Sequence, residues 1–164
     1  MGEKVVDARC LPSATTTWLT PRWILDALGE FDLDPCCPPE MPWRTAKRMI
    51  HQPEDGLIAE WSGRVWMNPP YGRTEIIPWM QKMASHGNGV SLIFARTETS
   101  WFQRWVFEEA RAIHFIGRRV RFCLPDGTIG GSPAAPSVLV AYGFDTAGFV
   151  RGCADIPGKT VWLK

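Results

Sequence analysis

The sequence predicts an α/β fold, in which helices pack on a layered sheet. Short apolar runs of strand length alternate along the chain with segments whose apolar residues repeat at helical spacing. Some of these runs stop abruptly at prolines, which is typical of strands that end inside a folded domain. At 164 residues the chain has the length of one domain, so we expect residues 1–164 to form a single unit.

The amino-terminal part is predicted to hold a loose arm and one short helix. Residues 1–17 are polar and show no clear period, which favours a loosely held arm. Thr20-Pro21 then precede apolar residues at helical spacing, which end at Gly29. A threonine cap, a proline at the first helical position and a glycine stop are typical helix boundaries.

A first strand is predicted over 31–34, where apolar and acidic residues alternate before Pro35. Asp34 then lies at the carboxyl end of this strand, the edge at which open α/β sheets bind ligands. Its carboxylate suits a cationic group, although a turn cap before proline explains Asp34 equally well. Residues 38–56 predict an irregular connection, with no helix stronger than Thr45–Met49.

The remaining elements are predicted from the same two features, apolar runs of strand length and apolar residues at helical spacing. We expect strands over 65–67, 90–95, 112–116 and 137–142, and helices over 74–83 and 100–110. Thr74 is the expected cap of the first of these helices, and Pro78 should kink or restart it. Residues 144–164 add glycine-rich turns and a short apolar segment to which we assign no role.

The segment from Val65 to Tyr71 carries the clearest chemistry. A buried strand ends there at Asn68, and neither of the next two prolines has a backbone N–H to donate, which favours free carbonyl acceptors at Asn68 and Pro69. A carboxamide oxygen and a backbone carbonyl can together accept both hydrogens of an exocyclic NH2 group, while the Tyr71 ring offers a flat face to a planar base. The pattern predicts a site for an amine on a ring.

Asn68-Pro69-Pro70-Tyr71 resembles the signature of amino-group methyltransferases that use S-adenosylmethionine. The wider set of motifs, in chain order, is similar to the phage-type DNA N(6)-adenine methyltransferases. The motifs are Thr20-Pro21, Phe31-Asp32-Leu33-Asp34-Pro35-Cys36, Asp55-Gly56-Leu57, Trp66-Met67-Asn68-Pro69-Pro70-Tyr71 and Ala95-Arg96-Thr97-Glu98-Thr99. The likeness runs from about Trp18 to Gly143.

This resemblance implies a Rossmann-like methyltransferase sheet, reduced in size, with helices on both faces. It implies methyl transfer from S-adenosylmethionine to the exocyclic amine of adenine in double-stranded DNA, after the base flips out of the helix. The implied catalytic residues are Asn68, Pro69, Pro70 and Tyr71. The implied cofactor-binding residues are Thr20, Pro21, Asp34, Pro35, Cys36 and Asp55. For Asp55 a plain turn, and for Cys36 a small core residue, are the competing interpretations.

Basic residues suggest where DNA would bind. Arg96 and Thr97 follow the strand over 90–95, at the same sheet edge as Asn68. Residues 117–136 hold Arg118, Arg119 and Arg121 and then a long Gly- and Pro-rich loop. If this stretch is extended, Arg119 and Arg121 share one face and suit phosphates, so we place DNA contacts here. A solvated sheet edge guarded by charge is the alternative.

Composition excludes several classes of function. No apolar stretch approaches the roughly 20 residues of a membrane span, and the first residues lack a signal peptide's apolar core, so a cytoplasmic protein is expected. The five cysteines show no Cys-x-x-Cys spacing, which argues against a zinc site, and no metal is expected. The formal net charge of +1 says little about nucleic acid, because binding needs a local basic face.

Three other functions compete with the main one. The four-residue motif would serve any planar amide or amine, so a methyltransferase acting on RNA or on protein glutamine is the nearest alternative. A DNA-binding module without catalysis is another, since Cys36-Cys37 stand where the resembled family has glycines after its acidic residue. A plain structural α/β domain would have to carry the ordered motifs by coincidence. The sequence makes no prediction of oligomeric state.

Overall fold

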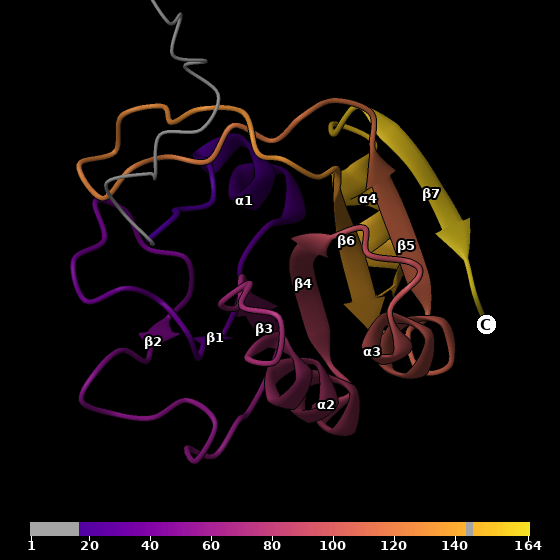
Figure 1. The fold of residues 1–164 in the computed structure, drawn as a ribbon, viewed down its shortest axis with the longest axis horizontal. Helices are drawn as coiled ribbons and strands as arrows, with labels where there is room; N and C mark the ends of the chain where they lie inside the picture. The colour runs from indigo at the N-terminus through magenta and orange to yellow at the C-terminus, as the bar shows by residue number, and fades with distance from the viewer. Residues whose placement is uncertain (1–16, 144–145) are drawn as a thin grey trace, which may run out of the picture.

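The computed structural model describes residues 17–143 and 146–164, which form a seven-stranded sheet with helices on both faces (Figure 1). The strand order is β2-β1-β3-β4-β6-β5-β7. Strands β1 to β4 run parallel, while β6 runs antiparallel to β4 and β5, and β7 antiparallel to β5. The strands are β1 (Leu33–Asp34), β2 (Arg48–Met49), β3 (Val65–Met67), β4 (Gly89–Phe94), β5 (Ala112–Ile116), β6 (Ser137–Tyr142) and β7 (Gly158–Trp162).

The two faces of the sheet carry separate cores. Val65 and Met67 of β3 face the core beneath α2 (Ile76–His86) and the helical turns α3 (Ser100–Phe102) and η2 (Gln103–Phe107), the last a π-helix. Trp66, between them, faces the opposite core beneath α1 (Arg22–Leu28) and α4 (Thr146–Cys153). This alternation follows from the two-residue period of a strand. It confirms an α/β sheet with helices on both faces.

The expected threonine cap of the first helix is wrong. Helix α1 begins at Arg22 with Pro21 as its N-cap residue, and no side chain caps it. The Pro21 carbonyl accepts the Ile24 N–H at 3.1 Å, while Thr20 lies buried before the helix starts. The glycine stop is confirmed, because Gly29 has φ of +80° and its N–H bonds the Leu25 carbonyl.

The connection after β1 contains a strand where the sequence at best favoured a helix. Arg48–Met49 form β2, which pairs with β1 in parallel register. Backbone bonds from Lys47 N to Phe31 O, Arg48 N to Asp32 O and Ile50 N to Asp34 O fix this pairing. The helix considered over 45–49 is therefore wrong, because main-chain pairing with β1 overrides a weak local preference.

Proline does not kink the second long helix. Helix α2 begins at Ile76 with Glu75 as its N-cap residue, so Thr74 is not the cap and Pro78 is the third helical residue. The N–H groups of a first turn have no partner within the helix, so a proline there removes no hydrogen bond. The predicted kink is wrong for that reason, and α2 continues to Gly87, whose φ is +68°.

The helix predicted over 100–110 is only partly right. The structure has a short α-helical turn at Ser100–Phe102, and the chain then widens into the π-helix Gln103–Phe107. The strands predicted over 65–67, 112–116 and 137–142 are confirmed with their bounds, and the one over 90–95 is shifted by one residue.

The 117–136 segment runs over the sheet edge at which the parallel strands end (Figure 1). It contains no strand, but Cys123 forms isolated bridges with Leu19 on one side and Ile129 on the other. The expected alternation holds, since Val120 and Phe122 are buried while Arg119 and Arg121 are exposed.

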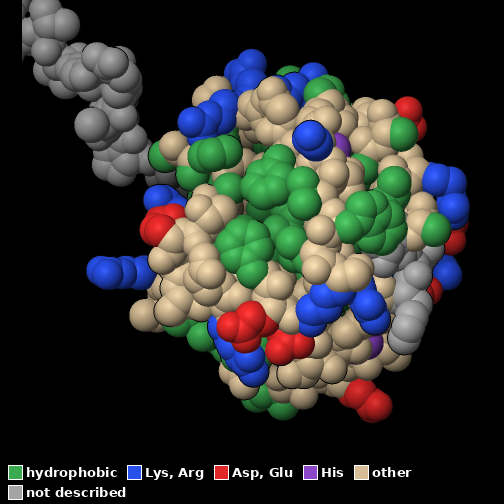
Figure 2. Space-filling view, turned by 90° about the vertical axis from the view of Figure 1, so that its right-hand side faces the viewer, with side chains coloured by type: hydrophobic (Ala, Val, Ile, Leu, Met, Phe, Trp, Pro, Cys, Tyr) green, Lys and Arg blue, Asp and Glu red, His purple; other side chains and the backbone are tan. Residues whose placement is uncertain are grey.

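The carboxyl-terminal region completes the sheet. The described part of 144–164 forms α4 and the edge strand β7. Figure 2 shows hydrophobic side chains gathered on the β7 side of the molecule, where Phe115, Val161 and Trp162 are exposed. Within the described ranges, no helix has the length and apolar character needed to cross a bilayer. Of the arm predicted over 1–17, residues 1–16 lie outside the described residues.

Candidate active site at the carboxyl edge of the sheet

Two turns meet where the parallel strands end. Asp34 is the last residue of β1, and Asn68 follows β3, its neighbour in the sheet. The Cys36 thiol donates to the Asn68 backbone carbonyl at 3.4 Å and ties the two turns together. That carbonyl is therefore not the free acceptor that the sequence predicted. Burial raises the pKa of the Cys36 thiol well above its ordinary value, so the thiol stays protonated and able to donate.

The Asn68 carboxamide has a defined orientation. Its Nδ2 donates to the Trp18 carbonyl at 3.1 Å, and its Oδ1 accepts the Tyr71 hydroxyl at 2.6 Å. The reverse orientation would set the amide oxygen against a carbonyl oxygen, where no hydrogen can be shared. The Oδ1 keeps a second lone pair, which can accept a hydrogen from a substrate amine.

Tyr71 is anchored at both ends. Its hydroxyl lies 2.9 Å from the Leu92 carbonyl as well as 2.6 Å from Asn68 Oδ1. One face of its ring stacks on Phe94, with centroids 4.3 Å apart and planes at 22°, and the Phe122 ring stands edge-on at 6.3 Å. Burial raises the pKa of the Tyr71 phenol, so the hydroxyl remains a donor. Phe94 therefore occupies one face of the Tyr71 ring, and a base could stack only on the other.

Asp34 is a buried carboxylate held by neutral donors. Its side chain is 3% exposed, and it accepts Cys36 N at 3.1 Å and Thr45 Oγ1 at 2.5 Å. Burial outweighs both hydrogen bonds and raises the pKa of Asp34 to about 6. The bond from Cys36 N is the turn cap that the sequence analysis considered for Asp34. In the described part of the chain, no cation neutralises the Asp34 carboxylate.

Thr20 and Asp55 approach this edge from two other segments. The Thr20 side chain is buried, and no group among the described residues bonds its Oγ1. Asp55 is exposed and caps its own turn, since Oδ1 accepts Leu57 N at 2.8 Å. That turn packs on the β1 end so closely that a Cβ added at Gly56 would lie 1.8 Å from the Pro35 carbonyl oxygen.

The predicted DNA-contact residues fall into two groups. Arg96 and Thr97 are exposed directly after β4. In the 117–136 segment, the Arg118 guanidinium lies 4.2 Å over the Trp23 ring, Arg121 Nε donates to the Gly130 carbonyl at 3.2 Å, and Arg119 is exposed. The second group shares the 117–136 segment with Phe122, whose ring reaches Tyr71.

Three contributors to the site were not predicted. Trp18 acts through its carbonyl, Thr45 through its bond to Asp34, and Phe94 through its stack on Tyr71. A backbone carbonyl leaves no signal in a sequence, and Thr45 lies in a connection without periodicity. Phe94 lies one residue before the end of the strand predicted over 90–95 and is the last residue of β4, and this position at the site edge is the signal that could have found it. In residues 17–143 and 146–164, no three His, Cys, Asp or Glu side chains gather as a metal site would require.

The fold and this edge define an α/β protein whose candidate site combines an oriented carboxamide, an aromatic ring and a buried carboxylate. The chain belongs to the DNA N-6-adenine-methyltransferase (Dam) family, whose model matches residues 8–141. It is 30% identical over 94 residues to the DNA N-6-adenine-methyltransferase of Escherichia phage T1, a match that covers 52% of this chain and 38% of that relative. No solved structure is significantly similar to it.

Proposed function

We propose that this protein transfers a methyl group from S-adenosylmethionine to the exocyclic amine of adenine in double-stranded DNA. The observation that carries the proposal is the Asn68 carboxamide, whose oxygen is oriented beside an aromatic ring at the carboxyl edge of the sheet. Membership of the Dam family supports adenine in DNA over RNA or protein glutamine as the substrate. The order and directions of the strands are compatible with a reduced Rossmann-like methyltransferase sheet in a single domain.

The residues at the β1 end fit the cofactor. Asp34 is a buried carboxylate without a cationic partner among the described residues, which suits an ammonium group. Thr20 Oγ1 is buried and unpaired in the described part of the chain, which suits a carboxylate. We assign Pro21, Pro35, Cys36 and Asp55 to the walls of the same site. S-adenosylmethionine, when bound, supplies a methyl group that its sulfonium has already activated.

The residues after β3 then act on the substrate amine. Asn68 Oδ1 and the Pro69 carbonyl accept its two hydrogens, and these hydrogen bonds strengthen as positive charge develops on the nitrogen, because its N–H groups become better donors. This is electrostatic stabilisation of the transition state. Pro70 removes a competing backbone donor and helps fix the turn. No side chain needs to form a covalent intermediate, because the reaction requires alignment of the amine with the methyl group. The amine nitrogen would bond the methyl carbon as the carbon–sulfur bond breaks, which leaves the cofactor as a neutral thioether, and the methylated amine would release one proton to water.

An adenine inside a duplex cannot reach this turn, so the base must flip out at a cost of a few kcal/mol. Stacking on the face of Tyr71 opposite Phe94 would offset about 1–3 kcal/mol of that cost. Arg119 and Arg121 are exposed on the 117–136 segment and are assigned to phosphates, and we assign the exposed Arg118, Arg96 and Thr97 to the same DNA interface.

The test is methyl transfer from labelled S-adenosylmethionine to unmethylated duplex DNA, with mass analysis of the product nucleosides. We expect N6-methyladenine from the wild type and a rate roughly 100-fold lower from Asn68→Ala, which removes one acceptor. Asn88→Ala is the matched control, because Asn88 lies before β4 at the opposite edge of the sheet and bonds the Gly63 carbonyl.

Each result has a definite meaning. Near wild-type transfer by Asn68→Ala would refute the assignment of this residue. Cofactor binding without transfer to DNA would favour an RNA or protein amide substrate. A protein that binds DNA but no cofactor would be the DNA-binding module considered from the sequence.

A further inference from the structure

The Asn68 carboxamide is held by a residue 50 positions earlier in the chain. A carbonyl can only accept, so the bond from Nδ2 to the Trp18 carbonyl, at 3.1 Å, decides which end of the amide is nitrogen. A carboxamide rotated by half a turn would present an NH2 group to the substrate amine. Two donors cannot bond each other, so methyl transfer by the mechanism above requires the orientation that Trp18 enforces.

Trp18 is in turn fixed by the 117–136 segment. Leu19 and Cys123 exchange two backbone hydrogen bonds, each 2.9 Å long, directly after Trp18. The Trp18 ring lies against Gly130, where an added Cβ would be 2.8 Å from Trp18 Cζ3 and 2.8 Å from the Phe122 carbonyl oxygen. The segment assigned to DNA contacts and the carboxamide assigned to catalysis are therefore joined through one residue.

We propose that Trp18 is a positioning residue for methyl transfer: its carbonyl orients the Asn68 carboxamide, and its ring and neighbouring backbone tie that carbonyl to the 117–136 segment. The inference rests on the proposed function, because it requires Asn68 Oδ1 to accept a hydrogen of the substrate amine. Trp18 does not touch the reacting atoms and acts only through Asn68.

Two substitutions disturb this arrangement from opposite sides. Trp18→Ala removes the ring that anchors the carbonyl, and Gly130→Ala adds a methyl that the ring and the Phe122 carbonyl must move to admit. Each should lower kcat about tenfold, the effect of losing one well-placed hydrogen bond. Trp18→Phe keeps an aromatic anchor and should restore most of kcat.

Gly131→Ala is the matched control. Gly131 is the next residue of the same segment, so any general effect of the segment on DNA binding is shared, but a Cβ added there meets nothing within 4 Å and so leaves Trp18 in place. We expect its kcat and thermal midpoint to equal those of the wild type, so a loss seen only in Gly130→Ala is due to the close approach to Trp18.

A positioning role of Trp18 is distinguished from a merely structural one by repeating Trp18→Ala and Gly130→Ala in the Asn68→Ala background. Without a carboxamide to orient, neither should lower the residual kcat further, whereas damage to folding or cofactor binding would add its full cost in both backgrounds. Additive losses, or an unchanged kcat in both single variants, would overturn the inference while the wild type still methylates adenine. A wild type that transfers no methyl group would overturn the proposed function as well.

Discussion

At the scale of the residue, Asp34 couples stability to pH. Its pKa rises from the ordinary 3.8 to about 6 because the carboxyl is buried, so the folded chain binds more protons than the unfolded chain between these values. The free energy of unfolding should therefore fall as pH rises from about 4 to 6 and stay lower above that range. The lost stability amounts to at most about 3 kcal/mol.

We expect Asp34→Asn to be more stable than the wild type at pH 7–8 and to match it near pH 4, because the amide never ionises. Denaturant unfolding from pH 4 to 8 measures this difference. Asp126→Asn is the control, and its effect on stability at pH 7–8 should have the opposite sign. Hydrogen bonds from Thr128 lower the pKa of Asp126, so loss of this carboxylate should lower the stability rather than raise it. Curves that coincide for Asp34→Asn and wild type throughout would show that Asp34 carries no unfavourable buried charge.

The same substitution tests the cofactor assignment. A bound ammonium group stabilises the ionised carboxylate, so wild-type affinity for S-adenosylmethionine should increase as pH rises through about 6. Asp34→Asn should bind weakly at every pH. An affinity that is independent of pH in the wild type would remove Asp34 from the cofactor site.

At the scale of the element, the 117–136 segment combines a buried side with a charged side. Val120 and Phe122 anchor it in the core, and the bond from Arg121 Nε to the Gly130 carbonyl braces its two limbs. Arg119 and Arg121 point away from that core and stay exposed. An anchored segment can present arginines to phosphates without first losing much conformational freedom.

Arg119→Gln and Arg121→Gln should each weaken DNA binding and reduce the salt dependence of log K by up to about 0.9, because each would release one fewer counterion. Binding titrations at several salt concentrations measure the slope. Arg104→Gln is the control, since Arg104 lies in η2 at the far end of the molecule from this segment and pairs with Glu108 (Figure 1). A slope that does not change would take the substituted arginine out of the interface.

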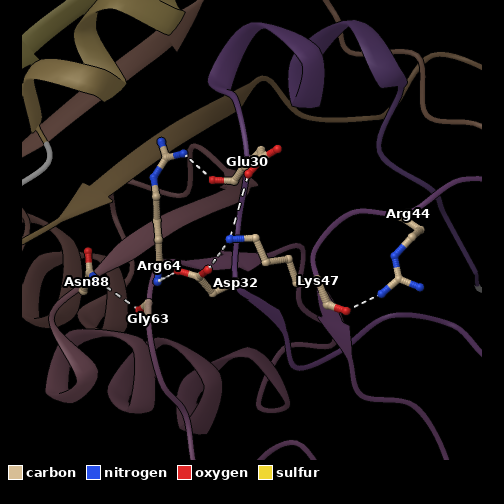
Figure 3. Close-up of polar contacts among 7 residues, drawn as sticks. All are labelled: Glu30, Asp32, Arg44, Lys47, Gly63, Arg64 and Asn88. Atoms are coloured by element: carbon tan, nitrogen blue, oxygen red, sulfur yellow. Dashed lines mark hydrogen bonds and ion pairs between the residues drawn. The ribbon is translucent and has the colours of Figure 1, made fainter.

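At the scale of the whole molecule, the starts and the ends of the parallel strands differ: the starts carry a polar network, and the ends carry the candidate site. The residues directly before β1, β2, β3 and β4 are Asp32, Lys47, Arg64 and Asn88. Figure 3 shows that Asp32 accepts both Lys47 Nζ at 3.0 Å and Arg64 N at 2.8 Å, while Asn88 donates to the carbonyl of Gly63, the residue before Arg64. Arg64 also donates to the carbonyls of Leu28 and Glu30. This network aligns the strand starts, while the candidate site occupies their ends.

Asp32→Ala should therefore lower stability without altering catalysis. Loss of the bond to Arg64 N costs about 1 kcal/mol, which lowers the thermal midpoint by roughly 2–4 °C in a chain of this size. Thermal unfolding measures the loss of stability, and kcat per folded molecule measures catalysis. If Asp32→Ala lowered kcat as much as Asn68→Ala does, catalysis at the strand ends would depend on the network at the strand starts.

Much of this protein is determined locally by its sequence. Strand β3 and the turn after it follow from three apolar residues and two prolines, because periodicity and a missing N–H act within a few residues. The same local rules give β5, β6 and the glycine stop of α1. They also bring Asp34 and Asn68 to one edge, since parallel strands end on the same side of a sheet.

Only the tertiary structure decided the rest. Strand β2 exists because its backbone pairs with β1, and Pro78 is harmless because α2 starts later than the expected Thr74 cap implies. The Trp18 carbonyl reaches Asn68, and Thr45 reaches Asp34, across long stretches of chain. Contacts made by backbone carbonyls, or by polar side chains in irregular connections, depend on where the packed core places them, and no local pattern of residues encodes that position.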